Sequence, residues 1–383
     1  MKIHNPYLRI FIRLHGTTGT QLSSIDWNDW HSILKLMINI SLNIITYWGI
    51  FIDSPVADRL LTDLEINKLF GYFQKANFYA FYPLLYVGQI VIFLIYGHHI
   101  IARLDSNAFI KVYDCKRNRL KAIFIFLLAF IFWQQRFIIR EYRHLSKPSF
   151  LIEYRTIELL VGIYFYHATQ MTNWYLLFYH QLITLFTLKQ IVKKLWSNKS
   201  MFRRPGKGMT NSFSIEQRLY RSIILLSEQS HYLQYYFSYV ILYLLIETSD
   251  SIIGSLSFVM MESFGTGIGW MSIYEQSIRW FLLLTLIELN RQNVQLFDHI
   301  DHHFIRKFTT IQMLMKIDYI RHVNNNNDDR IVRYTKYNQL KIYRQYYSLS
   351  LFNWLNVDYS LLINIFFFSF GYVLLISQTT KIN

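Results

Sequence analysis

The chain has 383 residues, of which 52% are apolar, 18% aromatic and 16% charged, with a mean hydropathy of +0.17. This composition is too apolar for a soluble domain of this length and indicates a membrane protein with several spans and modest loops. The formal charge of +15 does not indicate nucleic-acid binding, because the basic residues fall in short segments between apolar runs.

Seven apolar segments follow a polar lead, residues 1–31, and each predicts a membrane-spanning helix. The first six lie within residues 32–290 and are Ser32–Ile52, Asn77–Ile101, Lys121–Ile139, Ile157–Leu188, Tyr232–Met261 and Gly269–Leu289. The seventh lies in residues 348–378, where Tyr359–Ile376 is almost wholly apolar, and a tail of residues 379–383 follows. We therefore predict an all-α fold with seven transmembrane helices.

The distribution of basic residues predicts the orientation of these spans. Lys and Arg concentrate in the segments after the second, fourth and sixth spans, whereas the segment between the fifth and sixth has none. Because cytoplasmic loops are enriched in Lys and Arg, the N-terminus is predicted to be cytoplasmic and the C-terminus extracellular. The segment between the third and fourth spans departs from the pattern, since it holds Arg140, Arg143, Lys147 and Arg155. This orientation is the reverse of that of a G-protein-coupled receptor.

The last segment contains the run FNWLNVDYSLL, residues 352–362, followed by Tyr372 and, after five more residues, Gln378. This pattern resembles the last helix of insect gustatory receptors, which begins Phe-x-(Leu/Val)-Asp-x-Ser-Leu-Leu and ends Thr-Tyr-x5-Gln-Phe. The chain departs from it at Gly371, where the family has Thr, and at Thr379, where the family has Phe. The predicted orientation agrees with this family.

The resemblance implies a taste receptor of the plasma membrane that is a non-selective cation channel opened by a small-molecule tastant. Such channels are homo- or heterotetramers that pass Na⁺, K⁺ and Ca²⁺ through a pore lined by the last helices. By position, Gln378 matches the pore glutamine, Leu375 the apolar constriction one turn before it, and Tyr372 the tyrosine of the motif. Four apolar side chains close a narrow pore by dewetting, whereas amides solvate cations. The alternative for Gln378 is an interfacial helix end.

A ligand pocket is expected in the outer half of the bundle, where the predicted orientation gathers aromatic faces and a few polar groups. The expected ligand-binding residues are Tyr82, Tyr86, Gln134, Gln135, Tyr164, Tyr166, His167, Trp270, Tyr274 and Glu275. Tyr and Trp also collect at membrane interfaces, so each aromatic residue has a packing role as its alternative.

Several charged residues fall inside predicted spans, where an unpaired charge is costly, and four of them lie in the fifth and sixth spans as candidates for a role. Glu275 and Arg279 are four residues apart on one helix face, so they either neutralise each other or meet a ligand or pore water. Glu247 and Asp250, near the outer end of the fifth span, either hold cations near the pore mouth or are solvated loop acids.

The run His299-Ile300-Asp301-His302-His303 matches the HxxHH box of membrane desaturases and hydroxylases. Those enzymes hold two irons with about eight or more histidines from several boxes, and this chain has no HxxxH partner and no second HxxHH. We therefore expect no metal, no cofactor and no enzyme. The run is interpreted as a polar helix extension of the sixth span into the cytoplasm. The family resemblance implies that this extension belongs to a cytoplasmic helical anchor region, residues 291–347, and the alternative is a simple cytoplasmic hairpin of one subunit. The alternatives are a seven-span receptor that signals through cytosolic partners and, ranked after it, a multi-pass di-iron lipid desaturase or hydroxylase.

Overall fold

The computed structural model describes three long helices, the C-terminal region and short pieces of the rest of the chain. The described residues are 30–31, 33–34, 37–38, 41, 44, 80–81, 83–85, 87–88, 91, 173–174, 176–196, 223, 230, 233–249, 252–253, 277, 279–302, 348–352 and 354–380.

The described part of the chain is almost entirely helical, with 91% of its residues in helices. The three long helices comprise residues 176–196, 233–249 and 279–302, and α12 (Tyr359–Thr380) follows them near the C-terminus. A short antiparallel hairpin, β1 (Ser350–Leu351) and β2 (Leu355–Asn356), comes directly before α12. The all-α fold class predicted from the sequence is therefore confirmed.

The 176–196 helix is buried at one end and amphipathic at the other. Every side chain from residue 176 to residue 188 is buried, as expected for a helix that is packed on all sides. Beyond it, Ile191 and Leu195 remain buried and lie four residues apart, on one face. The opposite face carries the exposed side chains Lys189, Lys193 and Lys194. The helix therefore leaves the packed interior at about residue 189.

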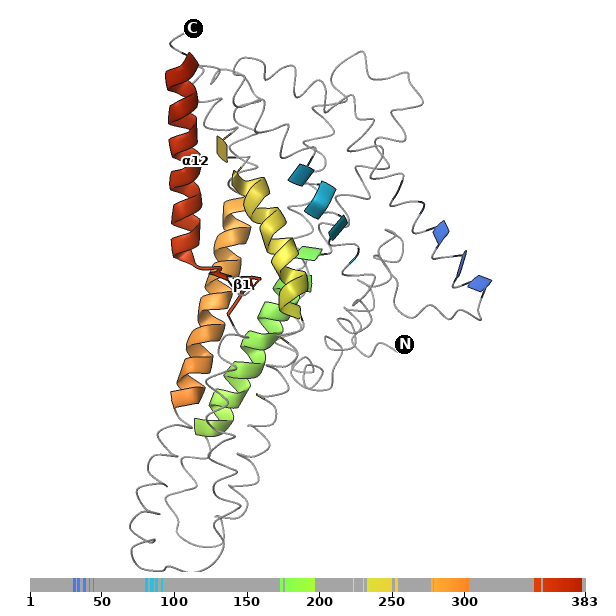
Figure 1. Ribbon diagram of the computed structural model, residues 1–383. Helices are drawn as coiled ribbons and strands as arrows, with labels where there is room; N and C mark the ends of the chain where they lie inside the picture. Colours follow the sequence, from blue (N-terminus) through green and yellow to red (C-terminus); the bar gives the residue numbers. More distant parts are fainter. Residues whose placement is uncertain are drawn as a thin grey trace, which may run out of the picture.

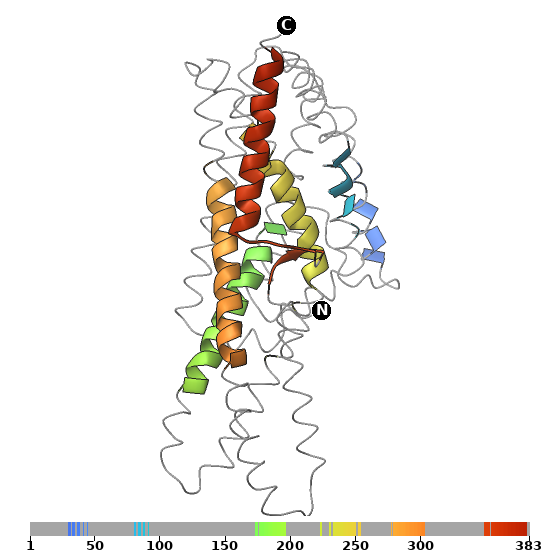
Figure 2. The same cartoon turned by 60° about the vertical axis from the view of Figure 1, so that its left-hand side comes forward.

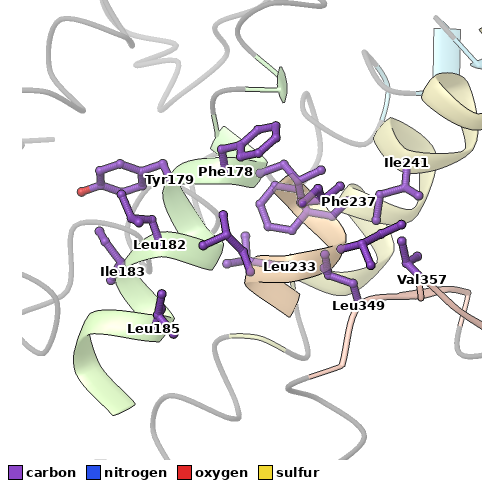
Figure 3. Close-up of a cluster of buried hydrophobic side chains, with 14 of the residues drawn as sticks. Phe178, Tyr179, Leu182, Ile183, Leu185, Leu233, Phe237, Ile241, Leu349 and Val357 are labelled. Atoms are coloured by element: carbon purple, nitrogen blue, oxygen red, sulfur yellow. The ribbon is translucent and has the colours of Figure 1, made fainter. Parts of the chain in front are cut away.

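The core joins the long helices to the segment before α12 (Figure 3). Phe178 and Ile183 of the 176–196 helix lie in one buried cluster with Phe237 of the 233–249 helix. Leu349 and Val357, on either side of the hairpin, belong to the same cluster and are 4% and 0% exposed. Burying a side chain of this size contributes about 1.5–3 kcal/mol. Residues 348–358, called the hairpin segment below, are therefore part of the core and not a free linker.

The last helix begins later than the sequence analysis predicted, at Tyr359 and not near residue 348, and it ends at Thr380. Two features stop it from extending further towards the N-terminus. Phe352 has a φ of 51°, which is incompatible with a right-handed helix. Asp358 then caps the first turn, because its Oδ1 accepts a hydrogen bond of 3.0 Å from the main-chain N–H of Leu361.

The structure describes some of the predicted spans more completely than others. The third, Lys121–Ile139, lies entirely outside the described residues, and the first and second are described only at scattered positions. The side chains of α12 are described without a break from Tyr359 to Leu375, and beyond that only at Gln378. Within the part of the chain that the structure describes, no helix is at once long enough and apolar enough to cross a membrane.

Candidate functional site

α12 has one packed face and one exposed face. Leu362, Ser369 and Val373 are buried and partly buried Ile365 lies between them, so these side chains form the face that packs on the other helices. On the opposite side, exposed residues follow one another at intervals of three or four, which places them in one line along the helix. This line, called the exposed stripe below, consists of Ser360, Asn364, Phe367, Gly371, Leu374 and Gln378.

The three predicted pore residues do not share one face. Gln378 belongs to the exposed stripe, and Leu375, which is 48% exposed, lies beside it. Tyr372 is only partly exposed, because it lies next to the packed face of the helix. The structure therefore brings Leu375 and Gln378 together and separates Tyr372 from them.

The hairpin segment is hydrogen-bonded to the 233–249 helix. The side-chain amide of Gln234 donates to the main-chain oxygen of Ser348, at 3.4 Å, and to the hydroxyl of Ser350. The hydroxyl of Ser238 donates to the main-chain oxygen of Ser350 and accepts from the main-chain N–H of Phe352, both at 3.0 Å. The second bond and the T-shaped contact between the Tyr239 and Phe352 rings hold the left-handed residue Phe352 in place.

Asn290 attaches the same segment to the 279–302 helix. Its Nδ2 donates to the main-chain oxygen of Val357, and its Oδ1 accepts from the main-chain N–H of Leu349, both at 2.9 Å. Asn290 is 4% exposed, so both bonds are shielded from water. One amide thus closes both ends of the hairpin segment, immediately before α12 begins. Buried main-chain groups need such partners, because each unpaired group costs about 1–3 kcal/mol.

An exposed polar group fixes the first turn of α12 to the middle of the 279–302 helix. The hydroxyl of Tyr359 donates to Oε2 of Glu288 at 3.0 Å. Arg291 also binds this carboxylate, through its Nε and one terminal nitrogen, both at 2.8 Å. These bonds to Glu288 raise the pKa of Arg291 further above its usual range. Because the pair is exposed, it contributes little to stability and mainly orients Tyr359.

Glu247 and Arg279 form a buried ion pair between the 233–249 and 279–302 helices. The terminal nitrogen Nη2 of Arg279 lies 3.4 Å from Oε1 of Glu247, and Nη1 donates to the main-chain oxygen of Glu247 at 3.0 Å. The two side chains are 8% and 9% exposed. Both interpretations of Glu247 from the sequence, a cation site at the pore mouth or a solvated loop acid, were therefore wrong. Glu275 and Asp250 lie outside the described residues.

The ten residues expected to bind the ligand lie outside the described residues: Tyr82, Tyr86, Gln134, Gln135, Tyr164, Tyr166, His167, Trp270, Tyr274 and Glu275. The HxxHH run is described as far as His302 and is helical there, in line with its interpretation as a helix extension. The imidazole of His299 stacks on Trp196, with 6.1 Å between the ring centroids. The described residues contain no group of three or more His, Cys, Asp or Glu side chains able to hold a metal ion.

A comparison with protein-family models found no match to this chain, and a search of curated proteins found none either.

The attachment residues Gln234, Ser238 and Asn290 were not singled out from the sequence. Gln234 and Ser238 are polar residues in an otherwise apolar stretch of helix, where an amide or hydroxyl needs a buried partner, whereas Asn290 lies among other polar residues. Such isolated polar residues can be recognised in the sequence, but the sequence does not show which groups they bind. The partners are main-chain groups of a hairpin whose sequence has no Gly or Pro to mark a turn.

Proposed function

We propose that the chain is a subunit of a ligand-gated, non-selective cation channel with seven membrane-spanning helices, in which α12 lines the pore. The subunits assemble as a homo- or heterotetramer in the plasma membrane, with the N-terminus in the cytoplasm and the C-terminus outside. A small-molecule tastant, bound in the outer half of the bundle, opens the pore to Na⁺, K⁺ and Ca²⁺. The proposal combines the sequence resemblance with the exposure of α12.

The apolar surface of α12 carries the proposal. Its exposed large hydrophobic side chains are Tyr359, Ile363, Phe366, Phe367, Phe368, Phe370, Leu374 and Leu375. A helix whose exposed surface is mainly apolar is favourable only where protein or lipid covers that surface. α12 has 22 residues, Tyr359–Thr380, and is therefore about 33 Å long. The hydrocarbon layer of a bilayer is roughly 30 Å thick.

The distribution of charge supports a membrane boundary at the start of α12. α12 and the far end of the 279–302 helix run in opposite directions from the hairpin (Figures 1 and 2). On the side of α12, Glu247 and Arg279 are buried and paired, and the partly exposed Glu288 bonds Tyr359 at the start of α12. On the other side lie exposed or partly exposed charges, among them Arg291, Lys193 and Lys194. Trp354, 93% exposed at the hairpin, suits the interfacial level, where tryptophan is enriched.

The exposed stripe supports the assignment of the pore to α12. Leu375 and Gln378 are exposed and lie away from the packed face of α12, so other copies of the chain can contact them. An amide at this position is favourable beside water and unfavourable beside lipid. Four copies that turn this side inwards would surround one axis with leucine and glutamine side chains. Leucines there exclude water when they are close together, and amides stabilise a passing cation.

The hairpin segment offers a physical route from the bundle to the pore helix. It is bonded to the 233–249 helix through Ser238 and to the 279–302 helix through Asn290. A relative shift of those two helices must therefore strain the segment or move the start of α12. In the proposed mechanism, the ligand binds more tightly to the arrangement in which the four α12 helices are spread, and it raises the population of that open state.

The test is the replacement of Leu375 by serine, measured as whole-cell current with G-protein signalling blocked. A polar ring hydrates the constriction and removes the dewetting barrier, so Leu375→Ser is expected to conduct cations without any ligand. Gln378→Ala in the same channel is expected to change the relative permeabilities of Na⁺, K⁺ and Ca²⁺. Phe370→Ser is the control, because Phe370 is also exposed but stacks on Phe366, away from Leu375.

A Leu375→Ser protein that reaches the cell surface and carries no current would contradict the channel. A response that appears only with G-protein signalling intact would instead favour the receptor that acts through cytosolic partners.

Gly371 provides a second test that does not depend on the constriction. A Cβ added at Gly371 meets no atom within 4 Å, so a side chain there has room within its own subunit. Gly371→Ala is expected to conduct normally and to stabilise the helix by about 0.5–1 kcal/mol. Gly371→Phe is expected to fold equally well but to abolish the current of Leu375→Ser, because four rings would fill the axis. An undiminished current in surface-expressed Gly371→Phe would place Gly371 against lipid.

A further inference from the structure

Asn364 is the polar residue of the exposed stripe that the sequence pattern did not associate with a function. It lies in the second turn of α12, on the same line as Gln378 and fourteen residues before it. At 1.5 Å per residue the two amides are about 21 Å apart along the helix axis. They therefore lie towards opposite ends of the proposed pore.

The surroundings of Asn364 leave its side-chain amide in need of a hydrogen-bond partner from outside the subunit. Its side chain is exposed, and among the described residues it has no hydrogen-bond partner. The neighbouring positions in the same part of the helix are Ile363, Phe367 and Phe368, each between 52% and 65% exposed. An amide in such an apolar surface at membrane depth loses its hydrogen bonds if lipid covers it. Water or the same amide of another copy would satisfy it.

The rotation of α12 about its axis determines whether Asn364 faces lipid or the proposed pore. The packed face fixes which side is turned away from the subunit, and Asn364 lies on the same line as Ser360, Gly371 and Gln378. Phe366, only two residues further, lies off this line with its ring 6.3 Å from that of Trp280 on the 279–302 helix. Three polar side chains and a glycine thus share the line with Phe367 and Leu374, while Phe366, which is also exposed, lies beside the line and contacts the ring of Trp280.

We propose that Asn364 forms a second polar ring of the ion pathway, near its cytoplasmic end, where it hydrates cations and sets their conductance. The proposal rests on the channel function proposed above. With the amide ring in place, the apolar part of the pathway is confined to the region between Asn364 and Gln378. Without it, the inner third of α12 would present only apolar side chains and the single hydroxyl of Ser360 to the axis.

The test uses single-channel recording of the Leu375→Ser channel, which needs no ligand, with further substitutions at residue 364. Asn364→Asp adds four negative charges near the cytoplasmic mouth, which concentrates cations there. We expect a several-fold larger outward unitary current and little change of the inward current. Asn364→Leu removes the polar ring, and we expect a several-fold smaller unitary conductance in both directions. Phe366→Leu is the matched control at nearly the same depth and is expected to leave the conductance unchanged.

A chemical measurement keeps the proposal testable if a charged or apolar residue at position 364 prevents folding. Cysteine is placed at residue 364 or 366 in a Leu375→Ser chain whose single cysteine, Cys115, is replaced by serine. A cationic thiol reagent, applied to the cytoplasmic side of inside-out patches, is expected to block Asn364→Cys channels and to leave Phe366→Cys channels unaffected.

The outcomes separate this proposal from the channel function. If Leu375→Ser conducts and Gln378→Ala changes its selectivity, but changes at residue 364 alter neither conductance nor reagent sensitivity, then Asn364 faces lipid and the second ring is wrong. If surface-expressed Leu375→Ser carries no current, the channel function fails and the second ring fails with it.

Discussion

Replacing Arg279 by leucine is expected to lower the free energy of unfolding by about 3–5 kcal/mol, because it leaves the buried carboxylate of Glu247 without its guanidinium partner. The substitution also removes the donor to the main-chain oxygen of Glu247, at 3.0 Å in the structure. The measurement is unfolding of the purified full chain in detergent micelles with increasing dodecyl sulfate, followed by tryptophan fluorescence.

The double variant Glu247→Leu with Arg279→Leu is the control for this expectation. Replacing both members of a buried ion pair by apolar residues is often neutral or stabilising, since both desolvation costs disappear together. We therefore expect the double variant to recover most of the stability lost in Arg279→Leu. Arg291→Leu, which breaks the exposed pair with Glu288, is expected to cost at most about 1 kcal/mol. Strictly additive losses at Glu247 and Arg279 would contradict the pairing.

The sequence could predict the elements that depend on apolar periodicity, but not the partners of the polar residues within them. The continuous 279–302 helix follows from its spacing of apolar residues, and the apolar character of α12 follows from its composition. The partner of Arg279 does not, because Glu247 lies 32 residues away on another helix. Ion pairs within one helix can be predicted from a spacing of four residues, as for Glu275 and Arg279. Ion pairs between helices depend on how each helix is rotated about its axis and packed against the other.

The start of α12 was mispredicted for a related reason. The hairpin segment alternates apolar residues with Ser, Asn and Asp and has no Gly or Pro, so no strong helix breaker separates it from the helix that follows. Its β1 and β2 are two residues long and gain stability from side chains of other helices, chiefly Gln234, Ser238 and Asn290. The local signal for the start of the helix was Asp358, because aspartate is a favoured N-cap residue. Its side chain accepts a hydrogen bond from the N–H of Leu361, three residues further along. The motif singled out Gln378 and Leu375, which remain predicted pore residues, whereas the rotation that groups Asn364 with them required the packed face of α12.

Replacing Asn290 by leucine is expected to free the hairpin segment and destabilise the chain by about 2–6 kcal/mol, because two buried main-chain groups lose their partners at about 1–3 kcal/mol each. The groups are the carbonyl of Val357 and the N–H of Leu349. Since 1.4 kcal/mol corresponds to a factor of ten, amide exchange in residues 348–358 is expected to accelerate at least about tenfold. Hydrogen–deuterium exchange with mass spectrometry measures this directly.

Asn293→Leu is the matched control, because Asn293 lies one turn further along the same helix, is equally buried, and bonds Gln181 of the 176–196 helix at 2.7 and 3.1 Å. It is expected to destabilise the chain to a similar degree without a selective increase of exchange in residues 348–358. If the hairpin segment transmits the movement of the helices to α12, Asn290→Leu must also change the open probability of the channel, and Asn293→Leu must not. Equal effects of the two variants on exchange and gating would mean that Asn290 only stabilises the core and that α12 is coupled to the bundle elsewhere.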